Sequence, residues 1–310
     1  MKKAAILILF STMLFSDSNV SGKVFFNHTT DLGEGGMNAF NMKRAYLTYA
    51  NSVNDKMSYT VTYDMGKNES GSAYTSFLKV AMVKWKTNIG DVTIGMQGMN
   101  MFKTMENTWG HRFIAKMPMD TYGYSASADL GVGLSQSFGS ISTSALITNG
   151  EGYKKTESAK HKKVSLHAVY GESQLNKKDG FNAGMSLSYE PYDMDSVTTS
   201  NSNVMGLFAG YAINGFRGGL EYDSKTIGEL SEQINSAYGT YKLNDKWSIL
   251  GRFDQHDEDT SVDNDVIRAI IAGIHFKVEK GLTISPTLRM TTLEGGDTEN
   301  AIVVNFQFKF

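Results

Sequence analysis

Cysteine and proline are the two residues that this chain largely does without. It has no cysteine and only 3 prolines among its 310 residues. Without cysteine there is no disulfide, thiolate metal site or cysteine nucleophile, and the absence suits an envelope compartment in which stray thiols oxidise. Proline removes a hydrogen bond from a β-ladder, so its scarcity fits a chain built mostly of central strands.

A large excess of charge of either sign is also missing. The 30 basic and 32 acidic residues give a formal net charge of −2. A nucleic-acid-binding protein would need a clear basic excess, so we expect no nucleic-acid partner.

The first 22 residues show the three parts of a secretory signal peptide. Met1-Lys2-Lys3 is basic, and the apolar run from Ala4 to Phe15 is too short to span a bilayer. Small residues allow cleavage after Ser18 or after Gly22, and the sequence leaves both open. We therefore expect a signal peptide over 1–22 and a single mature domain over 23–310.

No long apolar run follows the signal peptide. Apolar and polar residues instead alternate along the rest of the chain. No later segment approaches the roughly 20 apolar residues of a spanning helix, so a secreted chain of this kind is either soluble or a closed barrel. The alternation is clearest at the C-terminus. There, one side of an extended strand carries Ile302, Val304, Phe306, Phe308 and Phe310, and the other carries Val303, Asn305, Gln307 and Lys309.

The same pattern recurs along the chain and predicts an all-β fold, a transmembrane antiparallel β-barrel of about 16 strands. The predicted strands are 23–30, 39–51, 56–66, 77–88, 91–101, 122–137, 140–149, 161–172, 179–191, 202–213, 215–225, 230–243, 246–257, 264–279, 281–293 and 297–310. Three stretches, 77–88, 203–213 and 265–278, carry apolar residues at both parities, so the sequence does not settle which way their side chains face. Short turns alternate with longer polar connections, as at the two rims of an outer-membrane barrel.

Two pairs of segments carry a resemblance to a known family. Residues 40–49 (FNMKRAYLTY) with 57–64 (MSYTVTYD), and 129–132 (DLGV) with 148–153 (TNGEGY), resemble Gram-negative outer-membrane porins of the phosphate-selective porin O/P-like group. Members often carry a second arginine before the one at Arg44. This chain has Lys43 at that position, so the resemblance gives weaker support for an anion preference in this protein.

The resemblance also implies partners and an assembly state. The terminal Phe310 is similar to the signal that the outer-membrane barrel assembly machinery reads. Outer-membrane lipid and lipopolysaccharide would surround the barrel, and porins of this size resemble homotrimers. The expected location is the outer membrane of a Gram-negative bacterium.

The longest connection, residues 102–121, is the candidate constriction of the pore. A barrel of about 16 strands leaves an aqueous lumen, and loops this long are usually functional. General porins place a constriction loop at the same position, so we expect this loop to fold into the lumen. It carries Lys103, Glu106, His111, Arg112 and Lys116, a local basic excess. The alternative is an extracellular loop whose Trp109 packs on the rim.

Charges of both signs also fall on the inward face of the predicted strands. The candidates for selectivity are Arg44, Arg217, Arg252 and Arg289 with Asp64 and Asp129. The planar fork of arginine suits phosphate and carboxylate, which predicts a weak anion preference. The alternative, that these charges pair with one another and only line a general diffusion pore, stays open.

An acidic loop is the only candidate for a metal site. Its carboxylates Asp257, Asp259 and Asp263 could hold a divalent cation. Their spacing matches no full calcium motif, so we favour a solvated surface loop and expect no metal and no cofactor.

The function that these features predict is passive diffusion of small hydrophilic solutes through an outer-membrane porin, not enzymatic activity. Two alternatives remain. An outer-membrane barrel enzyme would need a serine or aspartate beside a base, and no recognisable nucleophile setting occurs. A plugged barrel acting as a surface adhesin would need a plug domain, and no segment is long enough to supply one.

Overall fold

The computed structural model describes residues 19–67, 74–158 and 160–310. The first eight strands are β1 (Asn19–Asp31), β2 (Asn38–Ser52), β3 (Met57–Gly66), β4 (Thr75–Thr87), β5 (Gly90–Gly98), β6 (Ala128–Phe138), β7 (Ile141–Thr148) and β8 (Lys163–Gly171). The next eight are β9 (Gly180–Asp193), β10 (Thr199–Ile213), β11 (Phe216–Ile227), β12 (Leu230–Lys242), β13 (Trp247–Asp257), β14 (Val266–Glu279), β15 (Leu282–Leu293) and β16 (Thr298–Lys309).

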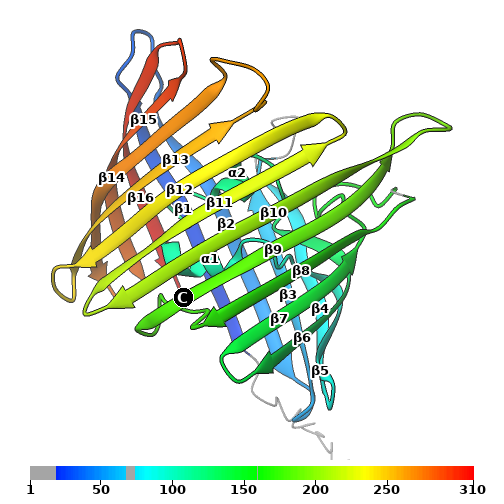
Figure 1. Cartoon of the computed structure of the whole chain (residues 1–310). Coiled ribbons are helices and arrows are strands. Elements are labelled where there is room, and N and C mark those ends of the chain that lie inside the picture. Colours follow the sequence, from blue (N-terminus) through cyan, green and yellow to red (C-terminus); the bar gives the residue numbers. More distant parts are fainter. Residues whose placement is uncertain (1–18, 68–73, 159) are drawn as a thin grey trace, which may run out of the picture.

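These strands close into one antiparallel barrel (Figure 1). Each strand pairs with its neighbours in the sequence, and β1 pairs with β16 to complete the ring. The prediction of a transmembrane antiparallel barrel of about 16 strands is confirmed. Two short helices, α1 (Lys103–Trp109) and α2 (Pro118–Thr121), lie between β5 and β6, and neither of these described helices is long and apolar enough to cross a membrane.

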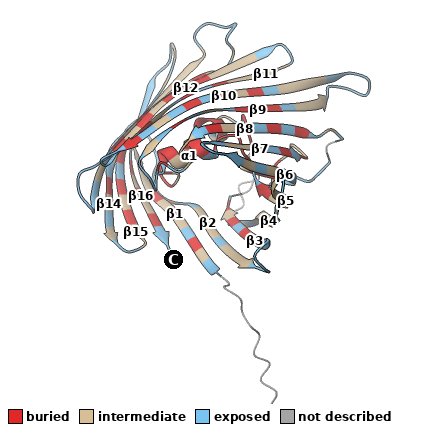
Figure 2. Ribbon diagram, turned by 60° about the horizontal axis from the view of Figure 1, so that its bottom comes forward, coloured by how far each residue is buried: buried red, intermediate tan, exposed pale blue. Residues whose placement is uncertain are grey.

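The two faces of the barrel wall follow the alternation of the sequence. On β16, Ile302 and Phe308 are 47% and 43% exposed, whereas Asn305 between them is fully buried. Figure 2 shows the same alternation of buried and exposed positions along other strands, such as β10. Because no barrel strand leaves its backbone unpaired, an outward apolar face can lie against hydrocarbon.

The barrel closes through residues at the two ends of the described chain. Asn19 to Gly22 pair with Ala50 to Leu47 of β2. The backbone of Gly22 also exchanges hydrogen bonds with that of Phe310, at 3.0 and 3.2 Å. The first strand therefore begins four residues before the predicted start at residue 23. The rest of the predicted signal peptide, residues 1–18, lies outside the described residues.

Two β-bulges explain part of the irregular alternation. Phe25 and Phe26 of β1 pair with Arg44 and Met42, so Lys43 is an extra residue in β2. In the same way, Lys79 is an extra residue in β4 between the partners of Thr62 and Tyr63. A bulge re-aims side chains, and both bulges here add a lysine to the inward face. The bulge at Lys79 also shifts the parity within the predicted strand 77–88.

The other two irregular stretches have apolar residues on both faces of the wall. In β10, Val204 and Phe208 are buried on the inward face, while Leu207 on the outward face is 44% exposed. In β14, the inward residue Ile271 is buried and the outward residue Ile270 is exposed. Those inward residues belong to an apolar cluster inside the barrel, described below.

A charge placed on the outward face should cost most at the middle of a strand. We expect Leu207→Arg to lower the free energy of unfolding by about 2–4 kcal/mol, because the guanidinium would lie near the middle of the bilayer. Ile213→Arg, at the short-turn end of the same strand, should cost about 0–1 kcal/mol. Urea titration of the protein folded into phospholipid vesicles measures both. Equal costs at the two positions would contradict an outward face in contact with lipid.

Candidate functional site

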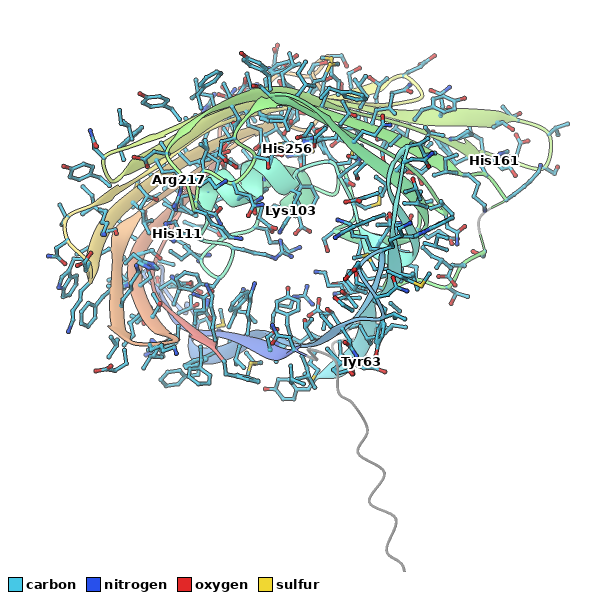
Figure 3. All side chains as sticks on the ribbon, turned by 90° about the horizontal axis from the view of Figure 1, so that it is seen from below. Tyr63, Lys103, His111, His161, Arg217 and His256 are labelled. Carbon is cyan, nitrogen blue, oxygen red and sulfur yellow. The ribbon has the colours of Figure 1, made fainter. Side chains whose placement is uncertain are left out.

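The segment between β5 and β6, residues 99–127, is called the inner loop here. Figure 3 shows its helix α1 inside the ring of strands, beside an open space. Its side chains Met101, Met105, Trp109, Met117 and Met119 are all at most 1% exposed. The opposing inward residues of the wall are apolar too: Val204, Phe208, Ile234, Tyr238, Leu250 and Ile271. Methionine adapts to irregular gaps, so the inner loop and the wall from β10 to β14 share a dry core.

Three arginines on alternate strands hold the backbone of the inner loop. Arg217 of β11 donates to the carbonyls of Thr108 (2.6 Å) and Trp109 (3.1 Å). The carbonyl of Lys116 accepts from Arg252 of β13 at 2.7 Å, and that of Ile114 accepts from Arg289 of β15 at 2.6 Å. The sequence predicts that these side chains tune selectivity. What the structure shows is that they position the inner loop.

Arg217 caps the C-terminus of α1. The last carbonyls of a helix have no partner within it, and a cation there is favoured by the helix dipole. The next residue, Gly110, has φ +73°, and a Cβ at this position would lie 2.6 Å from the Arg217 guanidinium. Glycine is therefore required both for the left-handed turn and for the close approach of the arginine.

The charged residues of the inner loop bind mainly one another. Arg112 donates from the same nitrogen to Glu106 and to Asp120, each at 2.7 Å. Lys103 contacts Glu106 at 2.8 Å, and Lys116 contacts Asp120 at 3.0 Å. Burial opposes the ionised form of Glu106, but Arg112 and Lys103 outweigh it and hold the pKa of Glu106 below its usual range. The predicted basic excess is thus largely compensated within the loop.

His111 adds no positive charge to this loop. Its Nε2 lies 2.9 Å from the Thr240 hydroxyl, and the residue is 4% exposed. Burial lowers the pKa of His111 well below its usual value, and His275, Arg217 and Lys309 act in the same direction. The histidine is therefore neutral near pH 7 and serves as a packing residue between the loop and the wall.

Asp64 forms the centre of a second polar cluster. It is fully buried, and its carboxylate lies 3.6 Å from Arg44 and 3.7 Å from Lys79. The phenol of Tyr153, from the connection between β7 and β8, donates to it at 2.6 Å. Lys79 and Tyr153 were not predicted. The break in alternation over 77–88 was the signal for Lys79, whereas nothing in the sequence placed Tyr153 beside Asp64.

Asp129 has a structural role. Its carboxylate accepts hydrogen bonds from the backbone N–H groups of Leu130 (2.9 Å), Gly150 (2.6 Å) and Gly152 (3.3 Å). The residue is 2% exposed, so it fixes the turn after β7 instead of presenting a charge to a solute.

The acidic loop does not form the metal site that was considered. Among the described residues, no group of three or more His, Cys, Asp or Glu side chains is placed to hold a metal ion. Asp259 accepts hydrogen bonds from the backbone and the hydroxyl of Ser261, at 3.0 and 2.7 Å, which is ordinary turn geometry. The three aspartates Asp257, Asp259 and Asp263 are thus not brought together around one point.

Not every inward titratable group has a partner of opposite charge. Glu221 and Asp223, on the inward face of β11, are 4% and 0% exposed, and within the described part of the chain no basic group lies within 4 Å of either carboxylate. Lys43 and Arg289 likewise have no carboxylate within that distance there. Mutual pairing therefore describes the inner loop well but not the whole wall.

An open space remains between the inner loop and the opposite wall. It is a cavity of about 700 Å³ lined by residues of β1, β2, β13, β14 and β15, by Lys67 directly after β3, and by the inner-loop residues 112–116, 121 and 122. Seven basic side chains line it: Lys43, Arg44, Lys67, Arg112, Lys116, Arg252 and Arg289. One carboxylate, Asp254, also lines it, and Arg252 binds that carboxylate at 2.8 Å. Arg44, Arg112 and Lys116 are also paired, with carboxylates outside the lining. Lys43 and Arg289, which have no such partner among the described residues, favour anions electrostatically.

Comparison with known proteins identifies the fold. No protein family and no curated protein matches the sequence. Among solved structures, OmpF of Salmonella typhi, in complex with daunomycin, is similar over 96% of this chain and 98% of its own, with 13% identity and a TM-score of 0.71. OprB of Pseudomonas putida covers 94% of both chains, with 10% identity and a TM-score of 0.71. The anion-selective porin from Comamonas acidovorans covers 94% and 99%, with 11% identity and a TM-score of 0.68.

These likenesses define the class of fold. The chain has the 16-stranded barrel of outer-membrane porins. None of the similarities singles out the phosphate-selective porin O/P-like group that the short sequence motifs resemble.

The cap on α1 can be tested directly. Arg217→Gln should weaken docking of the inner loop by about 1–3 kcal/mol, because the carbonyls of Thr108 and Trp109 lose their buried donor. Hydrogen exchange of peptides covering residues 102–112 measures this. Lys242→Gln is the matched control, since Lys242 bonds to Asp245 in the short turn and not to the loop. Unchanged exchange in Arg217→Gln would contradict the capping role.

The ion network of the loop should give a defined pH dependence. The pKa of Asp120 is also held low, since Arg112 and Lys116 outweigh the effect of burial. A lowered folded-state pKa stabilises the loop above the unfolded values of about 4, and this stabilisation is lost as the pH falls below them. The protection factors of the loop amides, in which the pH dependence of the intrinsic exchange rate is divided out, should therefore be constant between pH 8 and 5 and fall below about pH 4. Arg112→Gln should exchange faster already at pH 7, whereas Arg268→Gln, on the outward face of β14, should match the unaltered protein.

Proposed function

We propose that the protein is a porin of the Gram-negative outer membrane that lets small hydrophilic solutes diffuse passively, with a weak preference for anions. The cavity beside the inner loop is the observation that carries the proposal. A barrel of 16 strands is too wide for its own side chains to fill, and the inner loop occupies only part of the lumen. Of the seven basic groups around the remaining passage, Lys43 and Arg289 have no carboxylate within 4 Å among the described residues, and these two support the preference for anions.

The inner loop acts in this proposal as the constriction. Its dry contacts to β10–β14 and its three arginine tethers hold it against one side of the wall. The solute would then pass between the loop and the side formed by β1 and β2. Because the tethers and the packed core fix the position of the loop, they also fix the width of this passage. The constriction therefore needs no flexible gate.

An enzymatic role has less support. His167 contacts the hydroxyls of Ser186 and Thr104, each at 2.9 Å, which resembles a serine beside a base. The Ser186 hydroxyl, however, donates to the carbonyl of Met101 at 2.6 Å and is fully buried beneath the inner loop. A nucleophile needs a free path to its substrate, so this pair is better explained as an anchor of the loop. The plugged-barrel alternative conflicts with the open cavity.

The assembly and processing of the protein complete the proposal. OmpT of Vibrio cholerae, with 14% identity and a TM-score of 0.66, is described in a trimer form, and we propose a homotrimer for this chain too. We propose signal cleavage after Ser18, because cleavage after Gly22 would remove the residues that pair with β2 and with Phe310. Lipid and lipopolysaccharide would contact the outward face, and Phe310 would be read by the barrel assembly machinery.

Channel recording tests the function. The purified protein should give stepwise conductance in planar bilayers, and a potassium chloride gradient should give a reversal potential of the sign expected for chloride preference. One unpaired lysine about 10 Å from the ion path raises the local anion concentration about twofold in water. The same potential lowers the local cation concentration about twofold, so Lys43→Gln should lower the chloride-to-potassium permeability ratio about fourfold, while Lys280→Gln, in a short turn, should leave it unchanged. Absence of conductance would refute the channel, and cation selectivity would refute the anion preference.

A further inference from the structure

The cavity beside the inner loop combines two unpaired cations with an apolar surface. Arg289 donates only to neutral acceptors, the carbonyl of Ile114 at 2.6 Å and the side-chain oxygen of Asn305 at 3.2 Å. Lys43 reaches the cavity because the bulge in β2 gives it an inward position. Within the described residues, no carboxylate lies within 4 Å of either cation. Their positive charge is thus uncompensated at the surface of the cavity.

The apolar part of the lining comes from the wall and from the loop. Phe25 of β1 and Phe113 of the inner loop pack with ring centroids 6.2 Å apart. Ile114 lies next to Phe113, and Ile267 and Ile271 of β14 complete this side. A general diffusion pore for hydrophilic solutes has no need of such a surface, since apolar walls offer water and sugars no hydrogen bonds.

The unpaired cations and the apolar side chains together discriminate between kinds of anion. A small, strongly hydrated anion such as phosphate would lose part of its hydration against the phenylalanine and isoleucine side chains. An organic anion would place its charged group at the cations, and its apolar body would leave water as it contacts the apolar side chains. A cavity of about 700 Å³ is within the size range of sites for single small molecules.

We propose that this cavity is a transit site for small organic carboxylates, whose carboxylate meets Lys43 and Arg289 and whose apolar body lies against Phe25, Phe113 and Ile267. The inference rests on the proposed channel function and deepens it, because it names the class of anion that the passage prefers. Aromatic and branched aliphatic carboxylates fit it best. Inorganic phosphate and purely polar solutes fit it less well.

Block of the chloride current measures occupancy of the site. Benzoate should interrupt the single-channel current at a concentration about tenfold lower than acetate, which has the same charge but almost no apolar body. Phosphate should act no more strongly than acetate. Benzylammonium, which has the apolar body with the opposite charge, should not block.

Two kinds of variant separate the contributions of charge and of apolar contact. Lys43→Gln and Arg289→Gln should each weaken benzoate block about tenfold, because each removes a charged partner of the carboxylate. Arg289→Gln also removes a tether of the loop, so Lys43→Gln is the cleaner variant. Ile267→Thr should weaken block by benzoate about threefold and leave block by acetate unchanged. Arg268→Gln and Ile274→Thr carry the same changes on the outward face of β14 and should behave as the unaltered protein.

Equilibrium dialysis of labelled benzoate against the detergent-solubilised protein keeps the test independent of the channel. Saturable binding of benzoate that Lys43→Gln weakens would support the site, whether or not the protein conducts. Absence of conductance would refute the channel but not the site. An anion-selective channel in which benzoate and acetate block equally would refute the site and leave the channel standing. Block by benzylammonium as strong as that by benzoate would also overturn the proposal, since the cations would then play no part.

Discussion

The backbone of a chain that crosses a bilayer in strands must satisfy its own hydrogen bonds, and this constraint determines most of the structure. Every strand needs two neighbours, so the first strand must pair with the last, as β1 does with β16. Closure then fixes two faces for every strand. The outward face must be apolar, while the inward face is free to vary. The variation on the inward face is what distinguishes this barrel from a uniform water-filled tube.

That inward face is divided into a dry part and a wet part. From β10 to β14 it carries Val204, Phe208, Ile234, Leu250 and Ile271, which bury the methionines of the inner loop. On the other side it carries Arg289 of β15 and Lys43 and Arg44 of β2, which line the cavity. The inner loop therefore has a core of its own, independent of lipid, and the cavity lies beside it. At the start of the inner loop, the buried Asn100 bonds to Ser144 and Ser165 and anchors the loop to the wall.

The arginines of the wall have two roles at the same place. Arg252 and Arg289 bind loop carbonyls and at the same time line the cavity. A guanidinium has five donors, so it can hold a carbonyl and still present charge to a solute. The position of the loop and the charge of the passage are thus coupled through the same side chains. A change at either arginine alters both properties, which makes Lys43, with no such contact, the more informative residue.

The sequence by itself determined the barrel. Period-two alternation and the rhythm of short and long connections gave the strand number and the outward faces, because lipid imposes the same demand on every strand. It also placed Arg44, Arg217, Arg252 and Arg289 on the inward face and located the inner loop. The errors of the prediction from sequence concern single strand boundaries. The predicted strand 122–137 began too early, because Tyr122 and Tyr124 read as strand residues although they pack with the loop against His256.

Only the tertiary structure decided what the inward residues do. Whether an arginine faces a solute, a carboxylate or a loop carbonyl depends on which segments meet across the lumen, and that is a long-range property with no local pattern. Asp129 and Asp64 look alike in the sequence, yet one binds backbone N–H groups and the other binds Arg44, Lys79 and Tyr153. The stretch 77–88 departs from the alternation because its bulge brings Lys79 to Asp64. The stretches 203–213 and 265–278 depart from it because their inward residues pack against the inner loop.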